Sequence, residues 1–278
     1  MRILIRTSKW AIWARRLGSL AVPLLVLPVL MHRERFLDSA VFTVVAGFAA
    51  AVAGLAVLVA LVALARLWQT GDRGWGLALA GLVLGALSLA PFLWYFNLAT
   101  RYPPVTDIAT APRGELPLIF EPDTAAMPPP RLLVPDEQMR LFPNATTRVY
   151  PLDPVQLFAL VQRLVEAQGW DIRQSRAPGA VGAEGRINAR IVTLPGWREE
   201  AVLRISPIAG GGAVDMRSAS IGALHDFGSN GERLSAFLIA LDTEVTAFLR
   251  DNPTINAPVL PETEAEPSPE VDTGREAD

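Results

Sequence analysis

The densest group of side chains capable of chemistry lies between residues 215 and 230 of the 278-residue chain. It contains two carboxylates, one guanidinium, two hydroxyls and one amide, at Asp215, Arg217, Ser218, Ser220, Asp226 and Asn230. The guanidinium group of an arginine can donate two parallel hydrogen bonds to the oxygens of a phosphate or carboxylate. The loop after Ser220 leads into a predicted helix, whose free backbone N–H groups also favour an anion. One hypothesis is therefore that these residues bind a small polar or anionic ligand.

The same six residues have a second interpretation, as an internal polar network. Asp226 or Asn230 would hold the loop in place and Asp215 would pair with a neighbouring arginine, because buried polar groups need partners. The sequence favours this network over ligand binding.

A hydrolase is a third interpretation, because His225 lies close in sequence to Ser218, Ser220 and Asp226. However, the sequence has no G-x-S-x-G nucleophile elbow, and triads are defined by geometry rather than composition. One histidine with scattered carboxylates does not match metal-ligand spacings. The chain has no cysteine, which excludes thiolate chemistry. We therefore expect no enzyme, no cofactor and no metal site.

A folded domain must position these residues, and the periodicities place it between residues 136 and 250. Runs with the two-residue period of strands follow one another between turn residues, at 147–150, 170–174, 181–189, 199–205 and 213–220. Within the last run, Val214 and Met216 share one face, as alternate residues of a strand do. We expect Trp170 and Trp197 to close the hydrophobic core.

Two amphipathic helices complete the domain. The first is predicted from Asp153, its N-cap, to Gly169, where it ends. The second begins at Ser229 or Asn230, where Ser229 and Glu232 fit a capping box. The order β-α-β-β-β-β-α, with short turns between the strands, predicts the α+β class, with a small antiparallel sheet and both helices on one face.

Three apolar stretches precede this domain, at residues 17–31, 40–65 and 75–99. The second and third exceed the roughly 20 residues that a helix needs to cross a bilayer. Residues 1–100 are therefore expected to form three transmembrane helices, the first of them short and bent by Pro23 and Pro28.

The arginines and lysines indicate an orientation for these helices. If all three span, seven basic residues lie in the N-terminal tail and second loop, against four on the other side. The positive-inside rule then places the N-terminus in the cytoplasm and the domain outside it. If the first stretch does not span, the domain falls on the cytoplasmic side.

Two further segments differ in composition from the rest. Residues 101–135 contain nine prolines, which predicts an extended linker that lifts the domain off the membrane. Residues 251–278 hold eight acidic residues and one arginine, and we expect a disordered acidic tail. The domain between them is not basic, so no nucleic acid is expected as a partner.

The polar group also resembles the signature of a known family. Residues 214–220 and 226–230, with Arg233, are similar to domain-of-unknown-function family 1499, and residues 103–110 resemble its motif after the membrane helices. The resemblance implies a bacterial protein with a three-helix leader and no established activity. With the orientation from the positive-inside rule, we expect a multi-pass inner-membrane protein whose domain is periplasmic. The family often has arginine where this chain has Ile221 and Leu224, and serine in place of His225, so an anion site using those arginines is expected to be weaker here.

The leading hypothesis is a membrane-anchored module that binds a protein partner or a small or lipidic ligand in the bacterial envelope, beside the lipid bilayer. The alternatives are an assembly protein with a docking domain and an envelope hydrolase. A deep apolar cleft between sheet and helices would favour ligand binding. A filled core with a flat apolar surface patch would favour docking. The hydrolase requires activity that depends on Ser218 and His225.

Overall fold

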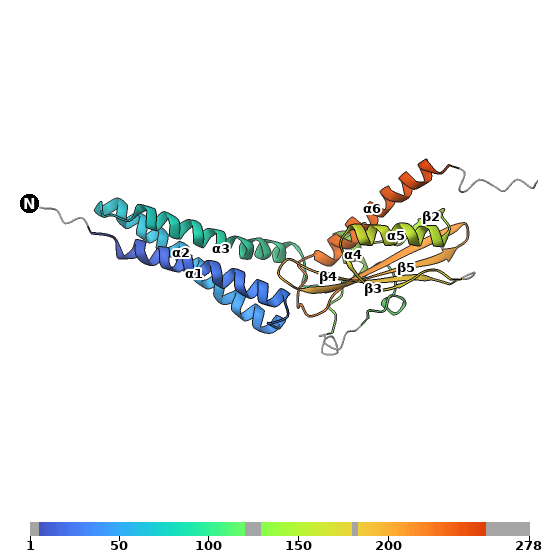
Figure 1. Ribbon diagram of the computed structural model, residues 1–278, viewed down its shortest axis with the longest axis horizontal. Helices are drawn as coiled ribbons and strands as arrows, with labels where there is room; N and C mark the ends of the chain where they lie inside the picture. Colours follow the sequence, from blue (N-terminus) through green and yellow to red (C-terminus); the bar gives the residue numbers. More distant parts are fainter. Residues whose placement is uncertain (1–5, 120–128, 180–182, 254–278) are drawn as a thin grey trace, which may run out of the picture.

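The computed structural model describes residues 6–119, 129–179 and 183–253, and it has an elongated shape in which a helix bundle continues into a mixed domain (Figure 1). The predicted class is confirmed, since three long apolar helices precede an antiparallel sheet with helices. Of the predicted acidic tail, residues 254–278 lie outside the described part of the chain.

The bundle consists of α1 (Lys9–Arg33), α2 (Ser39–Thr70) and α3 (Trp75–Arg101). Each is long and apolar enough to cross a membrane, which indicates a multi-pass membrane protein. α1 is longer than the apolar stretch and runs through both of its prolines as one helix. Its start lies beside the α2–α3 turn, where Ser8 N donates to Arg73 O at 2.9 Å. The start of α1 and the domain therefore lie at opposite ends of the bundle (Figure 1).

Small residues bring the three helices together. A Cβ atom on Gly81 would overlap the backbone of Ala14 in α1, and one on Gly85 would lie 3.2 Å from Ala53 O in α2. At Gly47, by contrast, an added Cβ atom would enter open space. Close backbone approach of this kind is how membrane helices associate, because lipid gives them no hydrophobic reason to do so.

The expectation of an extended linker at residues 101–135 is wrong for the described residues, because part of this segment folds into the domain. Asp107–Ala109 form strand β1, which pairs with the last strand of the sheet. A 3-10 turn, η1 (Arg113–Glu115), and a short helix, α4 (Pro135–Leu141), follow. Ile108 is fully buried in the domain core, so the segment folds because its apolar residues have a core to enter.

The remaining strands are β2 (Arg148–Tyr150), β3 (Asp171–Arg176), β4 (Gly185–Val192), β5 (Arg198–Ile208) and β6 (Gly211–Ser220). All pairings are antiparallel, in the order β1-β6-β5-β4-β3. β1 and β2 share the outer edge of β6, with β1 opposite residues 217–219 and β2 opposite residues 212–214. Short turns between successive strands produce this meander, as the sequence predicts.

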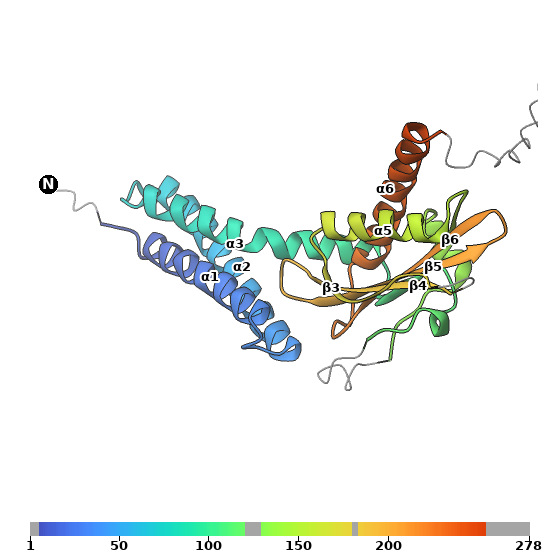
Figure 2. The same cartoon turned by 45° about the vertical axis from the view of Figure 1, so that its right-hand side comes forward.

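Helices α5 (Pro154–Ala167) and α6 (Ser229–Asp251) cover one face of the sheet (Figure 2). The predicted N-cap of α5 is confirmed, since Asp153 accepts a bond from Val155 N at 2.8 Å. The capping box at α6 is wrong. Its N-cap is Gly228, with φ of +82°, and Ser229 and Glu232 bond to other elements. Only glycine adopts this backbone conformation without strain.

The core between sheet and helices is filled by large side chains, including Phe237, Leu238, Leu203 and Met216. Trp170 stacks on Phe237 with 5.3 Å between ring centroids, as expected of a residue that closes the core. The expectation for Trp197 is wrong, because its ring packs edge-on against His32 and Phe42 of the membrane helices. On the opposite face, a smaller cluster forms under the segment after β1, at Ala109, Leu116, Leu118, Val202 and Ala219.

Candidate functional site

The six residues that the sequence groups together lie on two sides of the sheet. In β6, Val214 and Met216 point into the core beneath the helices, and Ser218 and Ser220 continue that face. The residues between them point to the opposite face, as strand geometry requires. Asp226 and Asn230 join the two serines, whereas Asp215 and Arg217 belong to the other side. One strand thus contributes to two separate networks.

The helix-side network is centred on the start of α6. Ser218 Oγ donates to Asn230 Oδ1 at 2.8 Å, and Asn230 Nδ2 donates to Ser220 Oγ at 2.9 Å. Ser220 Oγ donates in turn to Glu199, which pairs with Arg233. Glu199 is buried, and sequence reasoning missed it. The available signal is its register, because an antiparallel partner of Ser220 shares its face.

The loop before α6 is held by Asp226. Its carboxylate accepts bonds from Gly228 N at 2.9 Å and Asn230 N at 3.3 Å, so the amides expected to receive a ligand have an internal partner. Burial raises the pKa of Asp226 to about 6, against the opposing effect of these amides. These contacts are those of the internal network.

His225 does not complete a catalytic triad in the described part of the chain. Its Nδ1 accepts a bond from Phe227 N at 3.0 Å, and its ring stacks on that of Phe227. Burial lowers the pKa of His225, so the ring favours its neutral form. Ser218 and Ser220 donate elsewhere, and a base–nucleophile hydrogen bond is the geometry that a hydrolase needs.

On the other face, Arg217 makes a two-pronged ion pair with Asp107 of β1. Nε donates to Oδ1 at 3.2 Å and Nη2 donates to Oδ2 at 2.7 Å, and Arg217 Nη1 also donates to Leu116 O. Arg113 lies 3.2 Å from the same carboxylate, which is fully buried. The arginine that was expected to hold an anion therefore holds the carboxylate of the chain's own first strand.

Asp215 also has internal partners. Arg204 Nη2 donates to its Oδ2 at 2.7 Å, and the hydroxyls of Thr110 and Thr147 donate to Oδ1. This is the pairing with a neighbouring arginine that the network interpretation predicts. Ligand binding by the six residues remains a prediction that these contacts do not support.

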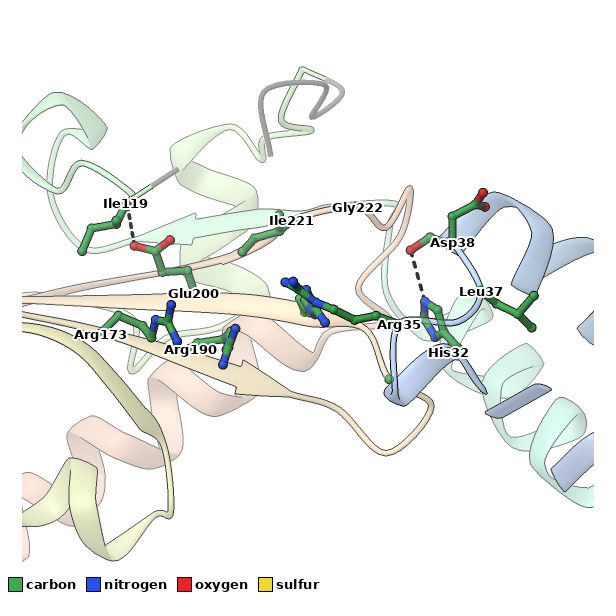
Figure 3. Close-up of a pocket in the computed structure, with 13 residues that line it drawn as sticks. His32, Arg35, Leu37, Asp38, Ile119, Arg173, Arg190, Glu200, Ile221 and Gly222 are labelled. Carbon is green, nitrogen blue, oxygen red and sulfur yellow. Dashed lines mark hydrogen bonds between the residues drawn. The ribbon is translucent and has the colours of Figure 1, made fainter. Parts of the chain in front are cut away.

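A different site lies on the outer face of the sheet, at its end nearest the membrane helices. This pocket has a volume of about 460 Å³. One wall is formed by His32 at the end of α1 and by Arg35 and Asp38 in the loop between α1 and α2. The strands form the floor, with Arg173, Arg190, Arg198 and Glu200. Figure 3 shows Arg35 extending from that loop over the sheet, toward Arg190 and Arg173. We call it the arginine pocket.

The arginine pocket has an excess of positive charge, since four arginines line it against two carboxylates. Asp171 holds Arg190 at 2.7 Å and Arg173 at 3.5 Å. Glu200 accepts from Asn188 Nδ2 and Ile119 N. Arg35 has φ of +67°, a backbone conformation that costs energy in any residue except glycine. The loop thus keeps Arg35 in a strained conformation while its side chain faces the sheet.

Direct contacts hold the α1 wall of the arginine pocket against the turn between β4 and β5. His32 Nδ1 lies 2.7 Å from Pro195 O, and Arg33 Nη1 donates to the carbonyls of Thr193 and Leu194 at 3.0 Å each. The His32 ring also stacks on Phe42. Sequence reasoning missed this site because more than 130 positions separate its helix-side residues from those of the strands, and no local motif connects them.

Comparison with known families covers most of the domain, including the floor of the arginine pocket, and assigns it no function. Residues 128–241 match the model of a family described as protein of unknown function (DUF1499). The match begins before α4 and ends within α6, so β1 and the membrane helices, with Arg35, lie outside it. No curated protein matches the chain.

Proposed function

We propose that this chain, in which residues 128–241 are a DUF1499 family domain behind three candidate membrane helices, binds an anionic ligand in its arginine pocket. The ligand is a phosphate or carboxylate group carried by a small molecule or by a lipid. The observation that carries the proposal is that arginines from both parts of the molecule line one cavity. It is a binding function, without chemistry on the ligand.

The donor chemistry supports an anion. A guanidinium presents several N–H groups in a plane and bonds two oxygens of a phosphate or carboxylate at once. Hydrogen bonds to charged groups contribute about 1.5–3 kcal/mol each, and less where water competes. The volume of about 460 Å³ lies within the range of small-molecule sites.

The position of the arginine pocket supports a ligand that comes from the membrane. One wall is the loop that joins two candidate spanning helices, so the pocket lies at the end of the bundle. Phosphates of lipid headgroups occupy this level of a bilayer. A filled core between sheet and helices offers no deep apolar cleft for acyl chains in the described residues, so the headgroup is the part to be recognised.

The proposed orientation places the N-terminus in the cytoplasm and the domain in the periplasm of a bacterial inner membrane. The excess of basic residues at the end of the bundle away from the domain supports it. The length of α1, which matches a full crossing, supports it as well. A reporter enzyme that is active only outside the cytoplasm, fused after Asp278, is expected to be active. An inactive fusion of a correctly inserted chain would contradict the orientation.

Binding is tested with the full chain purified in detergent. Two probes separate the sources of the anion: inorganic phosphate and a water-soluble short-chain phosphatidylglycerol. Replacing Arg35 with glutamine removes one charge from the pocket and is expected to weaken binding of the responding probe about tenfold, the equivalent of about 1.4 kcal/mol. Calorimetric titration measures the affinity.

The matched control is Arg140→Gln, which removes the same charge from an exposed position on α4. It is expected to change affinity less than twofold. A response to phosphatidylglycerol but not to phosphate identifies a lipid headgroup, and the reverse identifies a free anion. Equal affinity of Arg35→Gln and the unaltered chain for both probes overturns the proposal.

A second candidate function is docking of an envelope protein, and the filled core favours it. Mass spectrometry of the protein purified in mild detergent distinguishes the two. An anionic lipid that is lost on Arg35→Gln supports the pocket. A protein partner in fixed ratio that is retained on Arg35→Gln supports docking.

A further inference from the structure

Two loops of the domain extend to the end of the helix bundle. They are the β4–β5 turn (residues 193–197) and the β6–α6 loop (residues 221–228), which lie at the end of the sheet that faces the bundle (Figure 1). The β5–β6 hairpin is at the opposite end. These two loops define the base of the domain.

The aromatic residues of α3 show where the bilayer ends. Trp75 and Trp94 are both exposed on the surface of the bundle. From Trp75 to Trp94 the helix rises by about 28 Å, close to the roughly 30 Å thickness of a hydrocarbon core. Tryptophan and tyrosine gather at the two membrane–water interfaces. Trp94 and Tyr95 therefore mark the interface on the domain side.

Direct contacts place both loops of the base at that level. The ring of Tyr95 packs edge-on against Phe227 in the β6–α6 loop, with 5.0 Å between centroids. At the end of α1, Arg33 donates to the carbonyls of Thr193 and Leu194 in the β4–β5 turn. The two loops are thus attached to different helices but reach the same interface.

Large apolar side chains project from these loops without protein cover. Leu194 is 81% exposed and Leu224 is 63% exposed, and Phe36 in the loop between α1 and α2 is 76% exposed. Exposed leucines scattered over a surface need no explanation, but three large apolar residues in loops at the domain end of candidate spanning helices do. Contact with a bilayer removes such side chains from water, whereas a domain held away from the membrane would leave them hydrated.

We propose that the base of the domain is a membrane-contacting surface, with Leu194 and Leu224 inserted into the interfacial layer of the same bilayer that the helices cross. The domain then rests on the membrane instead of standing away from it. The folded state of residues 105–119, which leaves little free linker after α3, agrees with this position. The inference is independent of the arginine pocket, and holds whether or not the pocket has a ligand.

The absence of cysteine makes the test direct, because each variant carries one labelling site. Leu194→Cys and Leu224→Cys are labelled with an environment-sensitive fluorophore in the full chain. The protein is reconstituted in nanodiscs of phosphatidylcholine and phosphatidylglycerol, with and without lipids that carry a spin label near the headgroup. Spin labels quench only fluorophores within about a nanometre, so quenching reports contact.

The matched control is Val149→Cys, whose side chain is 64% exposed and therefore comparable with Leu224. Val149 pairs with Ala213, seven residues along β6 from Ser220, a separation of about 23 Å in a strand. Severalfold stronger quenching at positions 194 and 224 than at 149 is expected.

Quenching at 194 and 224 no greater than at 149 overturns the proposal. A variant that misfolds is recognised independently, because a disturbed domain no longer protects the β6 amides from hydrogen exchange in the same nanodiscs. Where a labelled variant misfolds, an aspartate at the same position, Leu194→Asp or Leu224→Asp, takes its place. The aspartate is expected to raise amide hydrogen exchange in the loop that carries it when the protein is in nanodiscs, but not when it is in detergent. Equal exchange in both media also overturns the proposal.

Discussion

The helix bundle and the domain are held together by different kinds of residue. The buried positions of the bundle are mostly alanines, such as Ala14 and Ala53, together with glycines at the closest approaches. The domain buries large apolar side chains such as Phe237, and it also buries charged pairs such as Asp107 with Arg217. The same chain thus uses two packing strategies on either side of Arg101.

The difference follows from the surroundings of each region. Burying a large side chain stabilises the domain because the alternative is contact with water. In lipid the alternative is equally apolar, so helices gain only from close van der Waals contact, which small residues permit. Substitutions that test charge pairing should therefore affect the domain, and substitutions that add a methyl group should affect the bundle.

The largest effect is expected for Asp107→Asn. The change leaves the buried Arg217 and the half-buried Arg113 without their counter-charge, and loss of one partner costs about 3–5 kcal/mol in other buried pairs. Pulse proteolysis of the full chain across a urea series measures the free energy of unfolding of the domain. The control, Glu137→Gln, removes an exposed ion pair with Arg140 and is expected to cost less than about 0.5 kcal/mol. Similar stability of the two variants would contradict a central role for the buried pair.

A smaller effect is expected for Gly81→Ala in the bundle. The added methyl group meets the backbone of Ala14, which cannot move aside as a side chain can, so α1 and α3 must separate. Overpacking of this kind costs about 1–3 kcal/mol. Gly47→Ala is the matched control, because its Cβ enters open space. Thermal unfolding of the bundle in detergent compares the two, and an equal midpoint would argue against close packing at Gly81.

The smallest effect is a pH dependence at the base of α6, tested by Asp226→Asn. The pKa of Asp226 is raised from 3.8 to about 6, so its protonated form is the one that folding favours. Its contribution to stability is therefore present below pH 4 and is lost as the pH rises through about 6. His225 has a lowered pKa and acts in the opposite direction, so the comparison with the variant isolates Asp226.

Between pH 6 and pH 4, the unaltered chain is expected to gain on the order of 1 kcal/mol relative to Asp226→Asn. Hydrogen exchange at the start of α6, measured over this pH range with correction for intrinsic rates, gives the difference. A constant difference between the two proteins would show that Asp226 does not titrate in this range.

Elements with regular periodicity were predictable from sequence, and the reason is local. The five strands after residue 146 and both long helices appear within a few residues of their predicted bounds, and Asp153 caps α5 as expected. β1 was missed because three residues among prolines carry no period, and only the wider sheet gives them a partner. Residues 103–110 resemble a family motif, but the resemblance does not indicate that Asp107 enters the sheet.

The candidate site was harder to predict from the sequence, because local patterns do not show which residues meet in the folded domain. Ser218 and Arg217 are adjacent in sequence, which suggested one site, yet a strand sends them to opposite faces. The arginine pocket joins Arg35 to Arg190 across regions that are distant in sequence. The arginines of the pocket can be read in the sequence, but no local pattern distinguishes them from the other arginines of the chain.

By itself, the sequence determined the three apolar helices, the order of strands and helices in the domain, and the α+β class. These depend on hydrophobic period, caps and turns, which act over a few residues. Only the tertiary structure decided that Asp107 pairs with Arg217, that Trp197 packs on the membrane helices, and that a cationic pocket lies between the two regions. Such pairings depend on which surfaces meet when the chain closes on itself, and short-range patterns do not contain that information.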